Sequence, residues 1–212
     1  MQKTTGEMRD LILDAAERLL ARFGYAKTTM EDIAQEAGIG RRTIYLHFPG
    51  KEEVALSSID RIVERLLERL GDIARDNNAP PEARLRRMLL TRVLFRFDSV
   101  HDYYQSVDDL LRAVRPAYLL RRERYFDAEA RVFAGALREG EASGEFAGVG
   151  DAFATAHALL LATNALLPHS LSARELGKRE EVEAKAARIA DLLLDGLRRR
   201  PGDWEDDDTR DR

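Results

Sequence analysis

The chain has 212 residues, of which 44% are hydrophobic and 34% are charged, with a formal net charge of −4 and no cysteine. This balance predicts a soluble globular protein of one or two domains, and the lack of cysteine excludes disulfides, thiolate metal sites and a cysteine nucleophile. The first residues are polar and no apolar run approaches the roughly 18 residues that span a bilayer, so a cytoplasmic protein without a membrane segment is expected.

Helical periodicity runs through almost the whole chain, whereas strand patterns are nearly absent, so the sequence predicts an all-α fold. In chain order, helices are expected at 7–23, between Thr28 and Gly38, and at 41–47, 51–77, 82–98, 102–114, 116–140, 150–168 and 179–199. Gly24 is expected to end the first helix. Thr28 and Glu31 have the spacing of a capping box, which would start the second.

These elements divide the chain into a three-helix unit at 1–50, a connecting helix at 51–78 and a larger helical domain at 79–200. The last twelve residues, PGDWEDDDTRDR, hold six acidic and two basic side chains, which predicts a disordered acidic tail at 201–212. The rest of the chain is electrically neutral, so only local clusters of charge can indicate a partner.

The stretch GIGRRTIYLHFPGK suggests a nucleic-acid contact. Two short helices joined by a tight glycine turn form a helix-turn-helix, whose second helix enters the major groove of DNA. Arg41 and Arg42 would begin that helix, and arginine can hydrogen-bond O6 and N7 of guanine together. Thr43 beside them can meet a thymine methyl or a base edge. Ile44 and Phe48 are four residues apart and are expected to face the core.

Contacts to phosphate are expected around this reading face. Tyr45 and His47 flank the buried side of the helix, and Lys51 begins the next one. Thr28 and Thr29 open the preceding helix, whose free amides and positive dipole end suit a phosphate. Each residue taken singly is more often a cap, a packing residue or part of a solvated surface, and it is their combination that favours DNA.

Residues 15–54, AAERLLARFGYAKTTMEDIAQEAGIGRRTIYLHFPGKEEV, resemble the DNA-binding domain of the TetR family of transcriptional repressors. The matching segments are Phe23-Gly24-Tyr25, Thr28 with Asp32-Ile33-Ala34, Ala37-Gly38-Ile39, Thr43-Ile44-Tyr45, His47-Phe48 and Lys51-Glu52-Glu53. Gly40 departs from the family pattern, because a serine or asparagine often caps the recognition helix there. Arg42 and Leu46 occupy positions that vary in the family, so the DNA sequence cannot be inherited from a relative.

The resemblance implies a homodimer that binds a palindromic operator in double-stranded DNA and leaves it when a small molecule enters the C-terminal domain. It implies base or phosphate contacts for Arg41, Arg42 and Thr43, and phosphate contacts for Thr28, Tyr45, His47 and Lys51. Repression follows from family analogy alone. The alternative is a DNA-binding regulator that a protein partner controls instead of a small molecule.

The last two helices are the candidate dimer surface, because apolar faces on consecutive helices can form a four-helix bundle with their symmetry mates. The alternative is that both helices pack inside one subunit. The candidate interface residues are Phe153, Leu160, Leu167, Val182, Ala186, Ile189 and Leu193.

A small-molecule site in a helical domain needs apolar walls and a few polar groups. Candidates with these properties are Phe97, His101, Tyr104, Tyr125, His157 and Asn164, although aromatic residues at helical spacing are more often core. The arginines at 92, 96, 121, 122 and 124 either attract an acidic ligand or solvate a surface, and the second interpretation is favoured.

An enzyme is not predicted. The four histidines, at positions 47, 101, 157 and 169, lack the close spacing of a metal site. The chain contains no nucleophile motif and no glycine-rich phosphate loop. We therefore expect neither a metal nor a cofactor.

Overall fold

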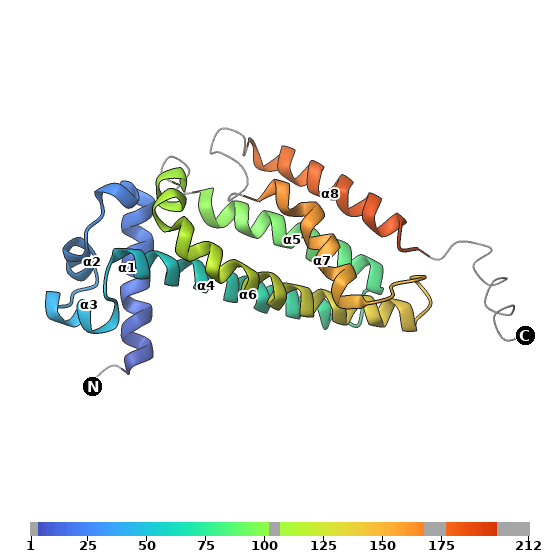
Figure 1. Cartoon of the computed structure of the whole chain (residues 1–212), viewed down its shortest axis with the longest axis horizontal. Coiled ribbons are helices and arrows are strands. Elements are labelled where there is room, and N and C mark those ends of the chain that lie inside the picture. Colours follow the sequence, from blue (N-terminus) through green and yellow to red (C-terminus); the bar gives the residue numbers. More distant parts are fainter. Residues whose placement is uncertain (1–3, 102–106, 168–176, 199–212) are drawn as a thin grey trace, which may run out of the picture.

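The computed structural model describes residues 4–101, 107–167 and 177–198, and these residues form helices joined by turns and loops, with no strand. Figure 1 shows α1 with the two short helices α2 and α3 at one end and an elongated helical body beyond them. The all-α prediction is confirmed. Among the described residues, no helix combines the length and apolar character that crossing a membrane requires.

The elements follow the predicted order. They are α1 (Thr5–Lys27), α2 (Met30–Glu36), α3 (Arg41–His47), α4 (Lys51–Ala74), α5 (Pro81–His101), α6 (Val107–Ala142), α7 (Ala152–Thr163), the 3-10 turn η1 (Asn164–Leu166) and α8 (Arg179–Asp195). The prediction for α3 is confirmed at both ends. The acidic tail expected at 201–212 lies outside the described residues.

The N-terminal unit has its own apolar core. Its members include Ile12 of α1, Ile33 of α2, Ile44 of α3 and Phe48 at the end of α3, and each is at most 1% exposed. Val54 of α4 belongs to the same cluster, so the connecting helix is anchored in this unit by its first turn.

Two local details differ from the expectation. Gly24 does not end α1 but bends it, with φ 78° in the region that favours glycine, and the helix resumes to Lys27. The capping box at the start of α2 is formed by Thr29 and Asp32, not by Thr28 and Glu31. Thr28 is only 1% exposed, and its hydroxyl donates to the Gly24 carbonyl at 2.8 Å, so it packs against α1 instead of capping α2.

The body is built around a larger core that α4 to α8 share. Leu66, Leu89, Phe133, Leu137 and Leu160, from four of these helices, are all fully buried in it. Because α4 contributes to both cores, it connects the N-terminal unit rigidly to the body, as its path in Figure 1 shows.

One predicted break is absent. Pro116 was expected to separate two helices, but α6 runs through it. A proline inside a helix costs about 3 kcal/mol, because it removes a backbone hydrogen bond and crowds the preceding turn. Val114, just before it, is buried in one cluster with Ala55 and Leu56 of α4, and Tyr118, just after it, packs against that cluster. We attribute the continuity of α6 to this shared packing surface.

Candidate nucleic-acid interface and interior polar cluster

The outward face of α3 is formed by residues one helical turn apart. Ile44 and Phe48 are fully buried, which turns Arg41, Arg42 and Tyr45 toward solvent. Arg41 has 73% of its side chain exposed, lies 6.0 Å from the Tyr45 ring and pairs with Glu31 at 3.0 Å. Such an exposed pair is worth little, so Arg41 can exchange Glu31 for another partner at small cost.

Leu46 completes this face and was not predicted as a contact. It is 74% exposed, which is unusual for a leucine in a short amphipathic helix. An apolar side chain there can meet a thymine methyl group. Thr43 and His47 are half-buried at the edges of the face.

Arg9 of α1 holds the end of α3 in place. Its Nη1 donates to the His47 carbonyl at 2.7 Å, and its guanidinium lies 4.1 Å from the centre of the Phe48 ring. Nη2 lies 3.4 Å from the Ser57 hydroxyl of α4. This cation satisfies an end carbonyl of the recognition helix, a role that the isolated arginine in the sequence did not indicate.

Lys51 has a structural task in addition to any contact with DNA. Its ammonium donates to the carbonyls of Tyr25 at 2.8 Å and Thr28 at 2.9 Å, and it lies 4.3 Å from the Tyr25 ring. It therefore joins the start of α4 to the link between α1 and α2. Thr28, being buried, has no hydroxyl to offer a phosphate, which corrects that prediction.

Thr29 is exposed at the start of α2, but its polar groups already hydrogen-bond Asp32. Its amide and hydroxyl donate to the Asp32 carboxylate at 2.9 and 2.7 Å, and these hydrogen bonds lower the pKa of Asp32. A carboxylate already sits at the positive end of the helix, where a phosphate was expected.

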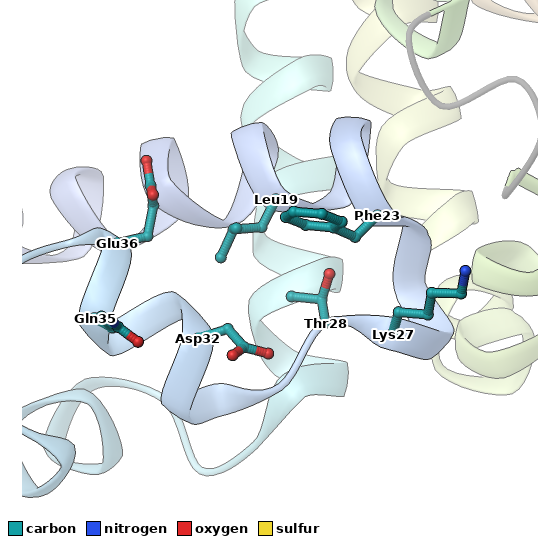
Figure 2. A pocket seen from close by; sticks show the side chains of 7 residues that line it. All are labelled: Leu19, Phe23, Lys27, Thr28, Asp32, Gln35 and Glu36. Carbon is teal, nitrogen blue, oxygen red and sulfur yellow. The ribbon is translucent and has the colours of Figure 1, made fainter.

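A groove of about 540 Å³ lies between α1 and α2, lined by Leu19, Phe23, Lys27, Thr28, Asp32, Gln35 and Glu36. Figure 2 shows Leu19 and Phe23 facing Asp32 and Gln35 across it. The groove carries two carboxylates, those of Asp32 and Glu36, and one lysine, so its rim is unfavourable for an anion. The groove therefore adds nothing to a phosphate-binding surface.

A set of polar contacts joins α6 to α4. Arg121 donates to both oxygens of Glu53 at 3.0 and 2.9 Å and to Asp60 at 2.5 Å. The Tyr125 hydroxyl also donates to Asp60, and Arg124 lies 3.2 Å from the same carboxylate. Burial raises the pKa of Tyr125 and the Asp60 carboxylate reinforces the shift. We call Arg121, Tyr125, Glu53 and Asp60 the α4–α6 clamp.

The predicted ligand residues enter different sets of contacts. Phe97 is buried in an apolar cluster with Val182 of α8, and Tyr125 belongs to the α4–α6 clamp. His157 lies 3.1 Å from Asp127 and beside two aromatic rings, those of Phe126 and Phe153. Asn164 accepts a hydrogen bond from Arg92 at 3.4 Å. Tyr104 and the side chain of His101 lie outside the described residues. The shared pocket stays a prediction.

A buried ionic cluster occupies the middle of the body. Arg92 and Glu129 are both fully buried, and Arg92 Nε donates to Glu129 at 2.5 Å. Arg92 Nη1 also donates to the Leu160 carbonyl at 3.2 Å and the Thr163 hydroxyl at 2.8 Å. Burial lowers the pKa of Arg92 to about 10, so it remains charged at neutral pH. This arginine does not solvate a surface, contrary to the favoured interpretation of the sequence.

Most of the predicted dimer residues are buried within the subunit. Leu160, Leu167, Val182 and Ala186 are at most 2% exposed, so they have no surface left to bury against a second copy. Phe153 and Leu193 also pack partly against the main core, and Ile189 is half-buried. The exposed leucines of these helices are instead Leu161 of α7 and Leu192 of α8, at 59% and 64%.

These features define a class: a helix-turn-helix unit with an exposed basic reading face, fused through one long helix to an all-helical body. Comparison with known proteins identifies the family that the N-terminal unit matches. Residues 12–57 match the model of "Bacterial regulatory proteins, tetR family". The HTH-type transcriptional regulator EthR of Mycolicibacterium smegmatis is 36% identical over 86 residues, which is 40% of each chain. The chain covers less than half of the length of the curated relatives it matches.

Solved structures extend the likeness to the whole fold. A TetR/AcrR-family transcriptional regulator from Thermobifida fusca is 27% identical with a TM-score of 0.59, over 90% of this chain and 98% of that one. The SmeT–triclosan complex has the same TM-score at 21% identity, over 92% and 95% of the two chains. The N-terminal unit therefore matches the DNA-binding domain of the TetR family of bacterial regulatory proteins, and the whole chain shares its fold with a TetR/AcrR-family regulator.

Proposed function

We propose that this protein is a ligand-responsive transcriptional repressor that binds a palindromic operator as a homodimer. The observation that carries the proposal is the exposed face of α3, where Arg41, Arg42, Tyr45 and Leu46 project from a helix whose other side is fully buried. Two guanidiniums and one apolar group can read guanine edges and a thymine methyl in one major groove. Regulatory activity in its TetR-family relatives supports the same role.

A second copy would bind through α7 and α8. Leu161 and Leu192 are exposed, and α7 with the following turn η1 adds exposed alanines at steps of three and four, which are Ala154, Ala158, Ala162 and Ala165. Small residues in such a row let two helices approach closely. A two-fold dimer of this kind places two α3 helices on half-sites about one turn of DNA apart.

The body, which we propose as the ligand-binding and dimerisation domain at 79–200, would receive a small-molecule effector. The SmeT structure, which shares this fold, holds triclosan. The α4–α6 clamp supplies a path by which a change in the body reaches the N-terminal unit at 1–50, because Glu53 and Asp60 lie just after the recognition helix. The alternative remains a regulator controlled by a protein partner.

One experiment tests the function and separates these alternatives. The protein is incubated with fragments of its source genome at physiological salt, and the bound fragments are sequenced. The complex with an enriched fragment is then challenged with the small-molecule and the protein fractions of a cell extract. Release by the small-molecule fraction supports the proposal, release by the protein fraction alone supports the alternative, and no enriched fragment would refute sequence-specific regulation.

A further inference from the structure

Two arginines converge on one carboxylate in the interior of the body, and a third lies beside the same aromatic ring as one of them. Arg92 donates to Glu129 Oε2 at 2.5 Å, and Arg96 donates to the other oxygen, Oε1. Arg122 lies across from them on α6, with its guanidinium 5.8 Å from the centre of the Phe126 ring, and the guanidinium of Arg92 lies 5.4 Å from the same ring. The cluster therefore lies between α5 and α6, and Thr163, at the end of α7, closes one side.

The charges in this cluster do not balance. In the described parts of the chain, Glu129 is the only carboxylate that hydrogen-bonds any of the three arginines. Three guanidiniums against one carboxylate leave an excess of two positive charges. Burial opposes ionisation of Glu129, but Arg96 and Arg92 outweigh it and lower its pKa, so Glu129 is already ionised and cannot supply more negative charge.

One buried donor in this cluster is also unsatisfied. Arg122 Nε is buried without a hydrogen-bond partner, and no hydrogen bond or ion pair engages Arg122 within the described residues. Arg96 uses only Nη2, and its side chain is 14% exposed. Both lie close to Tyr118, since burial raises the pKa of that tyrosine while Arg96 and Arg122 pull it down. Unpaired guanidinium donors in an interior are costly unless an acceptor arrives.

A structural explanation accounts for Arg92 but not for the other two. Arg92 bonds Glu129, a backbone carbonyl, a hydroxyl and the side-chain oxygen of Asn164, which is a complete set of contacts for a buried cation. Arg96 repeats a contact that Glu129 already has, and Arg122 has none. Their free donors point to a missing anion, because a guanidinium binds a carboxylate through two parallel hydrogen bonds.

We infer that Arg96 and Arg122 form the anion-binding end of the effector site and that the effector carries a carboxylate. The inference rests on the proposed small-molecule effector and names its chemical class. Glu129 and Arg92 hold Arg96 in position, and the Phe126 ring supports Arg122. Arg121 of the α4–α6 clamp is the neighbour of Arg122 on α6, so an anion drawn to Arg122 acts directly beside the contact between α6 and α4.

Isothermal titration calorimetry with three probes that share one tail tests this inference: sodium octanoate, octanamide and octylammonium chloride. Octanoate should bind at least about tenfold more tightly than octanamide, and octylammonium should not bind. Arg96→Gln and Arg122→Gln should each lower the affinity for octanoate by about tenfold and leave the affinity for octanamide unchanged.

Arg131→Gln is the matched control, since Arg131 lies on the same helix, is 68% exposed and pairs only weakly with Asp127 at 3.9 Å. It should bind all three probes as the parent does. Equal affinity for octanoate and octanamide, no octanoate binding at millimolar concentration, or a carboxylate preference that survives both arginine changes would overturn the inference. No DNA is present, so a failure here with intact operator binding would leave the proposed function standing.

Discussion

Arg41 and Arg42 stand at the start of α3, where the side chains of a recognition helix reach base edges. Replacing either by alanine should lower the affinity for the operator by roughly 1–3 kcal/mol per subunit and leave binding to random DNA nearly unchanged. Fluorescence anisotropy with an enriched fragment and a scrambled duplex measures both affinities.

Arg138→Ala is the control for this prediction. Arg138 is exposed near the far end of α6 and has no place in the reading face. It should leave the ratio of the two affinities unchanged. If Arg41→Ala and Arg42→Ala behaved like this control, the reading face would have been assigned wrongly.

A substitution at Lys51 should act differently from one at Arg41 or Arg42, because the Lys51 ammonium already donates to two backbone carbonyls. Lys51→Met should destabilise the N-terminal unit by about 1–3 kcal/mol. It should lower the affinity for all DNA sequences by the same factor. The slope of log affinity against log salt should stay the same. A slope that falls by about 0.9 would show instead that Lys51 neutralises a phosphate, as the sequence suggested. Urea unfolding and salt titrations give the two quantities.

The outward position of Arg41 and Arg42 could be predicted, whereas Leu46 on the same face and the supporting contacts could not. Arg41 and Arg42 follow a glycine turn and precede buried Ile44, a local pattern that the sequence displays in full. Thr28 and Thr29 each have an acidic residue three positions later, so spacing alone could not decide which one caps α2. Arg9 acts across 38 residues of sequence, and nothing near it in the chain indicates its partner.

At the scale of elements, the α4–α6 clamp determines how firmly the body holds the connecting helix. Arg121→Gln removes a cation that is only 23% exposed and leaves Glu53 and Asp60 close together without it. We expect a loss of about 1–2 kcal/mol in the free energy of unfolding, discounted for partial exposure. The effector should also lose part of its effect on DNA affinity, because α6 and α4 are then less tightly joined.

Arg112→Gln serves as the comparison. Arg112 also lies on α6, is 77% exposed and pairs with Asp109 one turn away. Such a pair contributes at most about 0.5 kcal/mol. Urea unfolding of the two variants should therefore separate them clearly. Equal losses would mean that the clamp is no more than a surface ion pair.

Hydrophobic periodicity predicted which segments form helices, but it did not predict where one helix continues into the next. Most predicted helices are present with shifted ends, since α4 stops at Ala74 and α7 at Thr163. Pro116 is the clear failure. Local propensity favoured a break there, and packing against Ala55 and Leu56, about 60 residues away, decided against it.

The whole molecule is expected to be a dimer through the exposed parts of α7 and α8. Leu161→Glu combined with Leu192→Glu should produce monomers, because two unpaired carboxylates would have to be buried in the interface. Both leucines are more than half exposed, so each subunit should stay folded. Sedimentation velocity measures the mass. Leu120→Glu, at an 85% exposed position on α6, should remain dimeric. A double variant that sediments like the parent would place the interface elsewhere.

Long-range organisation was the least predictable part of the site. The sequence showed a group of arginines but not that Arg92 is buried against Glu129, which lies 37 residues later on another helix. It showed apolar stripes on α7 and α8 but not which residues the subunit buries for itself. Leu160 and Leu161 are adjacent in sequence, yet the first is fully buried and the second is 59% exposed.

The measurement that tests the account most directly is selection of binding sites from a pool of duplexes with a random central segment. The protein is mixed with the pool at physiological salt, and bound duplexes are recovered and sequenced over several rounds. We predict a single enriched inverted repeat with half-sites about one helical turn apart, because two α3 faces related by a two-fold axis must read the same sequence on opposite strands. A pool that shows no enrichment, or an enriched sequence without two-fold symmetry, would contradict the account.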